Sequence, residues 1–243
     1  NLSFAYPDGT RALDSVSFQV APGERVALAG GNGAGKSTLL LHLAGLLDFG
    51  HVRGAVRVAG LEVEKRNLRL IRRSLGLVFQ NPDDQLFCPT IFDDVAFGPR
   101  NLGLDAAEVS RRVTAALAEV GLAGFERRSP HHLSLGERKR AALATVLALR
   151  PPILALDEPT SMLDGRGRRQ ICELLAGLSQ SAADANDAAG PPAPTQLIVT
   201  HDLEMIRRLC CRVIVLSRGR VAAVGPPEQV LADQSFLQSH GLA

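Results

Sequence analysis

The sequence predicts an α/β fold with a substantially parallel sheet, and three observations support that prediction. Short apolar runs of strand length alternate along the chain with segments of helical periodicity. The runs at residues 153–156 and 197–200 are almost wholly apolar, as expected of central parallel strands covered on both faces. The third observation is the segment Gly30-Gly31-Asn32-Gly33-Ala34-Gly35-Lys36-Ser37-Thr38, which fits G-x-x-x-x-G-K-[ST] without a mismatch.

The elements of the first half follow in chain order. Residues 1–4 already have the pattern of a strand, so we expect further residues before Asn1. Residues 13–20 alternate apolar and polar positions, which predicts a half-exposed strand. Residues 24–29 predict a buried strand and residues 38–44 a helix, which is the context that the glycine-rich motif requires. Two further strands are predicted at residues 55–59 and 75–79.

The second half continues the alternation of strands and helices. Between residues 105 and 120, apolar side chains recur at helical spacing with charges between them, which predicts an amphipathic helix. Residues 213–216 and 221–224 are joined by a short turn sequence containing Gly219, which predicts a hairpin. Residues 179–195 are rich in Ala, Asp, Asn, Gly and Pro and have little to bury, so we expect a flexible surface insertion there.

Composition limits the class of protein. The 243 residues, 46% of them hydrophobic, are enough for one large domain or two small ones, and we expect one. The net charge of +2 carries no signature of general binding to nucleic acid or to a membrane surface. No apolar run has transmembrane length, so we do not expect the chain itself to span a membrane. The four cysteines lack metal-ligand spacing and are interpreted as reduced cytosolic thiols.

The glycine-rich segment carries the most specific chemistry. Its glycines let backbone N–H groups curl around a polyphosphate, and the following helix N-terminus adds the positive end of its dipole. Lys36 is expected to reach the outer phosphates, and the Ser37 hydroxyl to hold Mg²⁺. The alternative is an ordinary glycine-rich turn before a helix, which the Lys-Ser pair and the flanking elements make a poor explanation.

Two later strands end in residues that suit the same site. Residues 153–156 are followed by Asp157, a candidate Mg²⁺ ligand, and by Glu158, which would polarise an attacking water. His201 follows residues 197–200 at a strand end, where α/β sheets bind ligands, and there it would sense the γ-phosphate. Taken singly, these signals are weak, because acidic residues often end strands at a protein surface. A lone histidine is likewise more often structural than catalytic.

Ser134 and Gly136 begin an apolar helical run between these two regions. A serine and a glycine at a helix start can present a hydroxyl and N–H groups to an anion. An ordinary helix cap would have the same sequence, so this segment alone is ambiguous.

Together these motifs resemble the nucleotide-binding subunit of an ATP-binding-cassette (ABC) transporter, over essentially the whole chain. The resemblance implies a P-loop NTPase fold with a RecA-like core, an N-terminal antiparallel β portion and an inserted helical subdomain at about residues 81–147. It also implies ATP and Mg²⁺ as cofactors. For the nucleotide, the resemblance implies Walker A at residues 30–38, Tyr6 stacked on adenine, and Gln80 as the Q-loop glutamine that bridges Mg²⁺ and a membrane partner. For hydrolysis, it implies Asp157 as the Walker B aspartate, Glu158 as the catalytic glutamate and His201 as the switch histidine. It also places Ser134 to Glu137 within the signature and Asp164 in the D-loop.

Some positions depart from the family pattern or have a second interpretation. Leu135 stands where the signature usually has Gly, and Glu137 where it usually has Gln. Ser134 and Gly136, which are expected to touch phosphate, are retained, so an active signature is expected. Leu135 also leaves open a weakly hydrolysing, regulatory half of a heterodimer. Tyr6, the only tyrosine, has a core aromatic role as its alternative.

A narrower resemblance lies in residues 78–87, 93–99 and 101–104, which are similar to energy-coupling-factor ATPases. It implies the motor of an importer of cobalt or nickel ions, with uptake of a vitamin such as biotin as an alternative. The implied partners are transmembrane subunits and a second ATPase subunit that forms a head-to-tail dimer, with a peripheral location on the cytoplasmic face of the membrane and no nucleic acid. A soluble ABC ATPase and a small-molecule P-loop kinase are the rival classes.

Overall fold

A six-stranded sheet runs through the computed structural model, which describes residues 1–47, 52–184 and 193–242. Its order is β11-β10-β3-β9-β8-β7. The five strands from β10 to β7 are parallel, and β11 pairs antiparallel with β10. The bounds are β3 Arg25–Ala29, β7 Leu75–Val78, β8 Ile153–Asp157, β9 Thr195–Val199, β10 Arg212–Ser217 and β11 Arg220–Gly225. The predicted parallel sheet and late hairpin are therefore confirmed.

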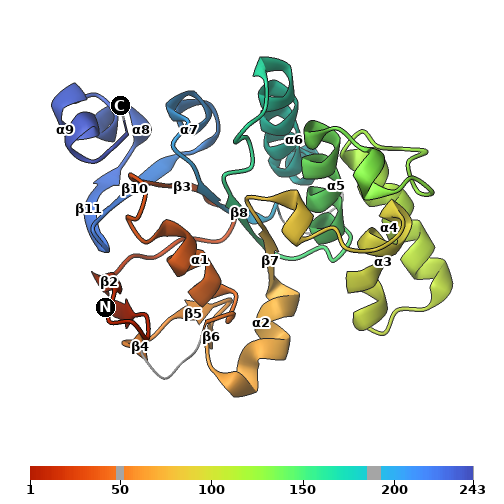
Figure 1. Cartoon of the computed structure of the whole chain (residues 1–243), viewed down its shortest axis with the longest axis horizontal. Coiled ribbons are helices and arrows are strands. Elements are labelled where there is room, and N and C mark those ends of the chain that lie inside the picture. The colour runs from red at the N-terminus through yellow and green to blue at the C-terminus, as the bar shows by residue number, and fades with distance from the viewer. Residues whose placement is uncertain (48–51, 185–192, 243) are drawn as a thin grey trace.

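The central strands are buried because helices cover them (Figure 1). All five residues of β9 are buried, as are Val26 to Ala29 of β3, which explains their apolar sequence. The helices outside the α3 to α5 region are α1 Lys36–Leu43, α2 Leu68–Ser74, α6 Gly165–Asp184, α7 Leu203–Leu209, α8 Pro227–Val230 and α9 Gln234–Ser239, with 3₁₀ turns at Lys65–Asn67, Pro82–Asp84 and Pro130–His132.

An antiparallel β portion lies at the N-terminal end of the molecule. Three strands have the order β2-β1-β4, and β5 pairs with β6. The bounds are β1 Leu2–Ala5, β2 Arg11–Val16, β4 Val52–Arg53, β5 Arg57–Val58 and β6 Leu61–Glu62. The strand predicted at residues 13–20 thus lies two residues earlier and ends at Val16. The strand predicted at residues 55–59 shortens to two residues, since Ala59 has a positive φ of 49° and ends it.

Three helices lie between β7 and β8 and pack on one another: α3 Ile91–Asn101, α4 Ala106–Glu119 and α5 Leu135–Leu147. Figure 1 shows them together at the end of the molecule opposite β1 and β2. Fully buried Ile91, Val113 and Ala141 belong to their shared core. α4 matches the helix predicted at residues 105–120 and is capped by Asp105, whose side chain accepts the N–H of Glu108.

The prediction of a flexible insertion at residues 179–195 is wrong at both ends of that range. Helix α6 continues through Asp184, and β9 already begins at Thr195. The remaining part of the predicted insertion, residues 185–192, lies outside the described residues. Over the described part of the chain, no helix combines the length and the apolar character needed to cross a membrane.

Candidate nucleotide site

The carboxyl ends of three neighbouring strands meet at one edge of the sheet. β3 pairs in parallel with β9 and β9 with β8, and Asp157 lies opposite Val199 in that ladder. The residues that follow these strands are the glycine-rich loop, Glu158 and His201. Motifs more than a hundred residues apart in sequence are therefore brought to the edge where open α/β sheets bind ligands.

The loop after β3 needs glycine at several positions for two different reasons. Gly30, Gly33 and Gly35 have φ values of 146°, 75° and 100°, which L side chains rarely adopt. A Cβ on Gly30 would lie 2.2 Å from the Leu216 carbonyl oxygen, and one on Gly35 would lie 2.5 Å from that of Ala12. At Gly33 the space is open and only the backbone conformation demands glycine. Asn32 and Ala34 complete the turn, whose N–H groups lead into α1.

Lys36 is the first residue of α1 and folds back over the loop. Its Nζ donates to the carbonyl oxygens of Gly30 at 2.7 Å and Gly31 at 2.9 Å. Burial lowers the pKa of Lys36, and the nearby carboxylates of Glu158 and Asp157 oppose that shift. The ammonium is thus held above the loop, where it can exchange carbonyl oxygens for those of a phosphate.

Asp157 at the end of β8 has the environment of a cation ligand. Burial raises its pKa, while a hydrogen bond from the Ser37 side chain opposes that shift. Its buried Oδ1 has no hydrogen-bond partner within the described ranges. An orphaned carboxylate oxygen beside a hydroxyl fits Mg²⁺, which binds to one or two carboxylates together with substrate phosphates. No cluster of three or more His, Cys, Asp or Glu residues forms a metal site in the part of the chain that is described.

Glu158 and His201 form a direct pair. Glu158 is buried, and its Oε1 lies 2.8 Å from His201 Nδ1. The Glu158 backbone has a positive φ of 46°, which is unusual for a residue with a side chain. His201 is largely exposed and reaches the carboxylate from the end of β9. The pair therefore sets the orientation of a carboxylate at the mouth of the site.

Ser134 and Glu137 form a reciprocal cap at the start of α5. The Ser134 side chain accepts the Glu137 N–H, and the Glu137 carboxylate accepts the Ser134 N–H at 2.8 Å and its hydroxyl at 2.7 Å. These hydrogen bonds from Ser134 lower the pKa of Glu137, so the carboxylate is ionised at neutral pH. Leu135 packs against the helical core, and a Cβ on Gly136 would lie 3.8 Å from Leu163 Cδ2, an ordinary van der Waals distance.

The remaining predicted residues lie at the borders of the site. The Tyr6 hydroxyl is 3.0 Å from Thr38 Oγ1, which places the ring next to the start of α1. Gln80 follows β7 with an exposed side chain, and its carbonyl accepts a bond from Lys139. Asp164 caps α6 by accepting the Gly167 N–H at 2.7 Å.

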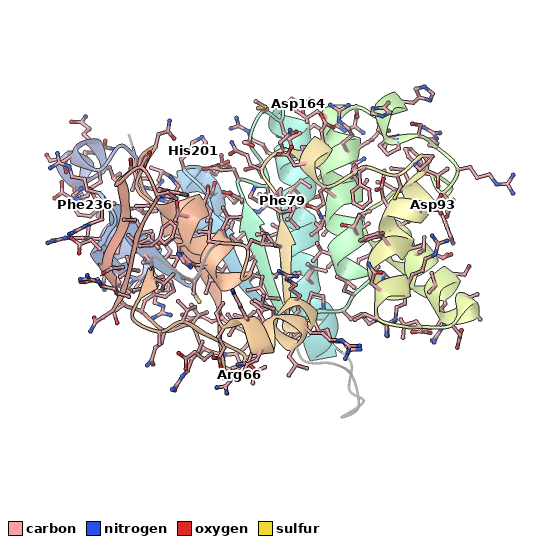
Figure 2. All side chains as sticks on the ribbon, turned by 60° about the horizontal axis from the view of Figure 1, so that its bottom comes forward. Arg66, Phe79, Asp93, Asp164, His201 and Phe236 are labelled. Atoms are coloured by element: carbon pink, nitrogen blue, oxygen red, sulfur yellow. The ribbon has the colours of Figure 1, made fainter. Side chains whose placement is uncertain are left out.

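The structure separates the signature from the glycine-rich loop of the same chain. In Figure 1, α1 and α5 lie on opposite sides of β8. Figure 2 shows Asp164 and His201 toward the same edge of the molecule, with Asp93 on the helical portion. Ser134 and Gly136 therefore do not complete the nucleotide site that Lys36 and Ser37 begin in their own chain.

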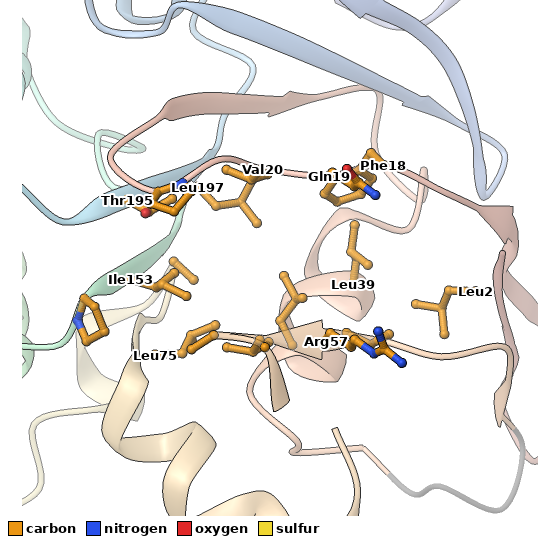
Figure 3. A pocket seen from close by; sticks show the side chains of 18 of the residues that line it. Leu2, Phe18, Gln19, Val20, Leu39, Arg57, Leu75, Ile153, Thr195 and Leu197 are labelled. Carbon is orange, nitrogen blue, oxygen red and sulfur yellow. The ribbon is translucent and has the colours of Figure 1, made fainter. Parts of the chain in front are cut away.

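A cavity of about 940 Å³ is lined by residues of β1, β5, α1, β8 and β9, among others (Figure 3). Apolar side chains such as Leu39, Val58 and Leu197 line it. None of the predicted nucleotide-site residues is part of its lining. The cavity is therefore a different feature from the phosphate site.

Three residues near the site were missed by the sequence analysis. Lys139 donates to carbonyls on two loops, Gln85 joins the Gln80 loop to α5, and Asp94 accepts the N–H groups of Phe87 and Cys88. Only Lys139 had a usable signal, because lysine occurs at just positions 36, 65 and 139 in a chain whose other basic residues are arginine. The partners of all three lie on other elements, so local patterns do not reveal them.

Comparison with known proteins gives a consistent result. Residues 13–161 match the family model described as ABC transporter. The chain is 52% identical to a putative ABC transporter ATP-binding protein of Streptomyces avermitilis, over 99% of this chain and 86% of that protein. It is 47% identical to the energy-coupling factor transporter ATP-binding protein EcfA of Carboxydothermus hydrogenoformans, over 100% of this chain and 84% of that protein.

A solved structure shows the same likeness. The chain superimposes on cbiO1 of Clostridium perfringens, described as part of the ABC transporter complex cbiONQ, with a TM-score of 0.81. The two are 34% identical, and the match covers 98% of this chain and 91% of the other.

Proposed function

This chain belongs to the ABC transporter family, and from that premise we infer that it is the ATP-hydrolysing motor subunit of an energy-coupling-factor importer. The observation that carries the inference is the meeting of the Lys36 loop with Asp157, Glu158 and His201 at one edge of the sheet. The similarity to EcfA and to cbiO1 supports the importer class.

In the proposed mechanism, some residues of the site bind the nucleotide and others transfer the proton. The loop N–H groups and Lys36 bind the β- and γ-phosphates of ATP, and Tyr6 stacks on adenine. Mg²⁺, held by Ser37, Asp157 and Gln80, would neutralise charge on the phosphates. Glu158 takes a proton from the attacking water, and His201 holds that carboxylate in position and senses the γ-phosphate.

A second ATPase subunit completes each site. Ser134 and Gly136 present a hydroxyl and helix N-terminal N–H groups at the start of α5, and Figure 1 shows α5 on the other side of β8 from α1. We therefore place the γ-phosphate of a partner subunit there, in a head-to-tail dimer that ATP closes and hydrolysis opens. The phosphate acts as the ligand that biases a two-state element.

The membrane partner docks beside α3. Phe87 and Phe97 are 65% and 49% exposed, and their rings meet edge to face at 5.1 Å. Exposing an aromatic pair of this kind to water is unfavourable in free energy, and such pairs are typical of interaction surfaces. Buried Asp94 accepts the N–H groups of Phe87 and Cys88, each at 2.9 Å, and so holds the loop that presents Phe87. The pair lies between Gln80 and the end of α3, in the segment similar to energy-coupling-factor ATPases.

The substrate we propose is a cobalt or nickel ion, which is cargo and not a resident metal. The support is the resemblance of residues 78–87 to cobalt-type members of the class, together with the structural likeness to cbiO1. Vitamin uptake by the same motor is the second candidate. In energy-coupling-factor transporters a separate membrane component selects the substrate, so the two candidates share this chain's chemistry.

The experiment that tests the proposal is recovery of the tagged chain from detergent-solubilised native membranes, followed by an ATPase assay on the eluate. We expect a transmembrane subunit and a small substrate-binding membrane protein to co-purify with Mg²⁺-dependent ATPase activity. The small protein's specificity for cobalt, nickel or a vitamin then decides the substrate. An active ATPase that brings down ribosomes or no membrane protein would instead favour a soluble ABC ATPase.

A further inference from the structure

Lys139 is a buried cation that the catalytic scheme does not use. Its side chain lies on α5 and is 6% exposed. The Nζ donates to the Gln80 carbonyl oxygen at 3.2 Å, to the Glu158 carbonyl oxygen at 2.9 Å and to Ser161 Oγ at 2.9 Å. An ammonium has three hydrogens, so these acceptors use all of its donors.

The three acceptors belong to the segments that follow β7 and β8, at the border of the candidate nucleotide site. Gln80 follows β7 and begins the segment that carries Phe87, Glu158 follows β8, and Ser161 lies in the turn before α6. Lys139 itself stands on the helix that Ser134 caps. One nitrogen atom therefore joins the partner-docking segment, the catalytic loop, the D-loop and the signature helix.

The bond to Glu158 supports a strained peptide. Glu158 has a φ of 46°, and its N–H donates to the Val199 carbonyl at 2.9 Å. Its carbonyl accepts both Lys139 Nζ and the Ser161 hydroxyl, each at 2.9 Å. Strained backbone persists only where its surroundings over-determine it. Without Lys139, the Glu158 carbonyl loses a charged hydrogen-bond donor.

The geometry explains why lysine stands at this position. The sequence uses arginine for nearly all of its basic residues, yet position 139 is lysine. One ammonium can donate to three converging oxygens, whereas a planar guanidinium spreads its donors over three nitrogens. The Lys139 residue also borders a small hollow lined by apolar residues such as Val78, Leu156 and Pro159.

We propose that Lys139 is the positioning residue that couples the partner-docking segment to the catalytic carboxylate. A displacement of Gln80 by a docked partner moves Lys139, and Lys139 moves the peptide that aims the Glu158 side chain. The inference rests on the proposed roles of Gln80 and Glu158. It adds a residue that touches neither nucleotide nor metal in the proposed scheme.

The first test compares kcat with nucleotide affinity in Lys139→Met, which keeps the length of the stem. We expect kcat to fall at least tenfold while the Kd for ATP stays within threefold, because the phosphate loop is intact. Lys65→Met is the matched control, since Lys65 is exposed on a 3₁₀ turn, and it should match wild type. The kcat of Lys139→Arg should also lie below that of wild type, because a guanidinium does not reproduce the three hydrogen bonds of the ammonium. Full activity in Lys139→Met or Lys139→Arg would overturn the proposal.

The second test measures hydrogen–deuterium exchange of the purified chain without nucleotide. We expect Lys139→Met to speed exchange in residues 78–85 and 157–164 and to leave residues 30–38 unchanged. Faster exchange throughout the chain together with a lower Tm would mean a general structural role and would overturn the proposal, as would wild-type exchange in both loops.

A second variant guards against misfolding of Lys139→Met. Ser161→Ala removes one acceptor at a half-buried position and should lower kcat by a smaller factor. Because Lys139 and Ser161 act in one network, the loss of kcat in the double variant should be smaller than the product of the two single losses. Multiplicative losses would contradict the network. The exchange result does not depend on whether Glu158 is the base, so failure of the base assignment would be distinguishable from failure of the coupling.

Discussion

At the scale of single residues, the site brings the cation of Lys36 and the carboxylate of Glu158 to the same edge, from segments that follow different strands. Lys36 rests on the carbonyls of its own loop, and Glu158 is held by His201 and by the Lys139 network. In the proposed scheme, Lys36 binds phosphate and Glu158 accepts a proton from the attacking water. Changes at the two positions are therefore expected to separate binding from chemistry.

Lys36→Ala should abolish ATP binding at working nucleotide concentrations. Loss of charge-assisted hydrogen bonds to phosphate costs about 2 kcal/mol or more, which raises Kd by at least about thirtyfold. Isothermal titration with ATP measures the effect, and Lys65→Ala, an exposed lysine, is the control. Affinity equal to wild type would reject the phosphate-loop assignment.

Glu158→Gln should retain ATP binding and lose turnover by roughly a hundredfold or more, since the amide cannot accept the proton of water. The bound ATP should then hold two chains together. Light scattering with and without ATP measures the dimer, and a phosphate-release assay measures turnover. Turnover near wild type in this variant would remove Glu158 from its proposed role.

Two neighbouring cysteines should differ sharply in reactivity. Burial raises the pKa of Cys210 to about 12, and Cys211 is exposed. Since only the thiolate is nucleophilic, a raised pKa means that Cys210 gains reactivity only as the pH approaches that value. Iodoacetamide at pH 8 should label Cys211 and spare Cys210 in the folded chain, and label both in denaturant. Mass spectrometry reads both sites in one peptide, and equal labelling of the folded chain would contradict the burial of Cys210.

At the scale of elements, the start of α5 has two tasks that compete. The Glu137 carboxylate caps the helix, yet it also occupies the Ser134 hydroxyl that is proposed to meet a partner's phosphate. Because this carboxylate is ionised at neutral pH, it adds a negative charge where a phosphate should approach. If a partner's phosphate binds at Ser134 as proposed, glutamate at position 137 in place of the usual glutamine therefore weakens the closed dimer.

Glu137→Gln should strengthen ATP-driven dimerisation with little effect on folding. Glutamine also closes a capping box, so the change in unfolding free energy should stay within about 0.5 kcal/mol. On the Glu158→Gln background, the ATP concentration at half-dimerisation should fall at least threefold. Glu173→Gln, at a mostly exposed carboxylate on α6, is the control. A dimer that weakens instead would show that the carboxylate assists the contact.

At the scale of the whole molecule, the sheet edge and the helical portion divide two functions. The edge holds the candidate nucleotide site, and the α3 region exposes Phe87 and Phe97, the proposed docking surface for a membrane partner. The loop from Gln80 to Thr90 joins them, and both Gln85 and Lys139 tie it to α5. The two functions should consequently be separable by substitution.

Phe87→Ser combined with Phe97→Ser should abolish recovery of the membrane partner while basal ATPase activity stays within twofold. Both side chains are exposed, so their loss removes contact area with a partner and little internal packing. Pull-down from native membranes measures the effect. Leu70→Ser, an exposed apolar residue on α2, is the control and should keep the partner. Undiminished recovery by the double variant would move the docking surface elsewhere.

By itself the sequence determined the features that depend on contiguous residues. The phosphate loop, the buried strands before it and before Asp157, and the helix capped by Asp105 each follow from local spacing and backbone preference. The motif order also determined the family. The first and last residues of the short strands were predicted less well. Short pairings such as β5 with β6 depend on neighbouring segments more than on their own residues.

Only the tertiary structure decided which distant groups touch. It joined His201 to Glu158, joined Lys139 to Gln80 and Ser161, and left Phe87 and Phe97 without cover. Those outcomes depend on how strands far apart in the chain align in one sheet and on which faces the helices bury. Periodicity reports which face of an element is apolar, but it does not report what lies against that face.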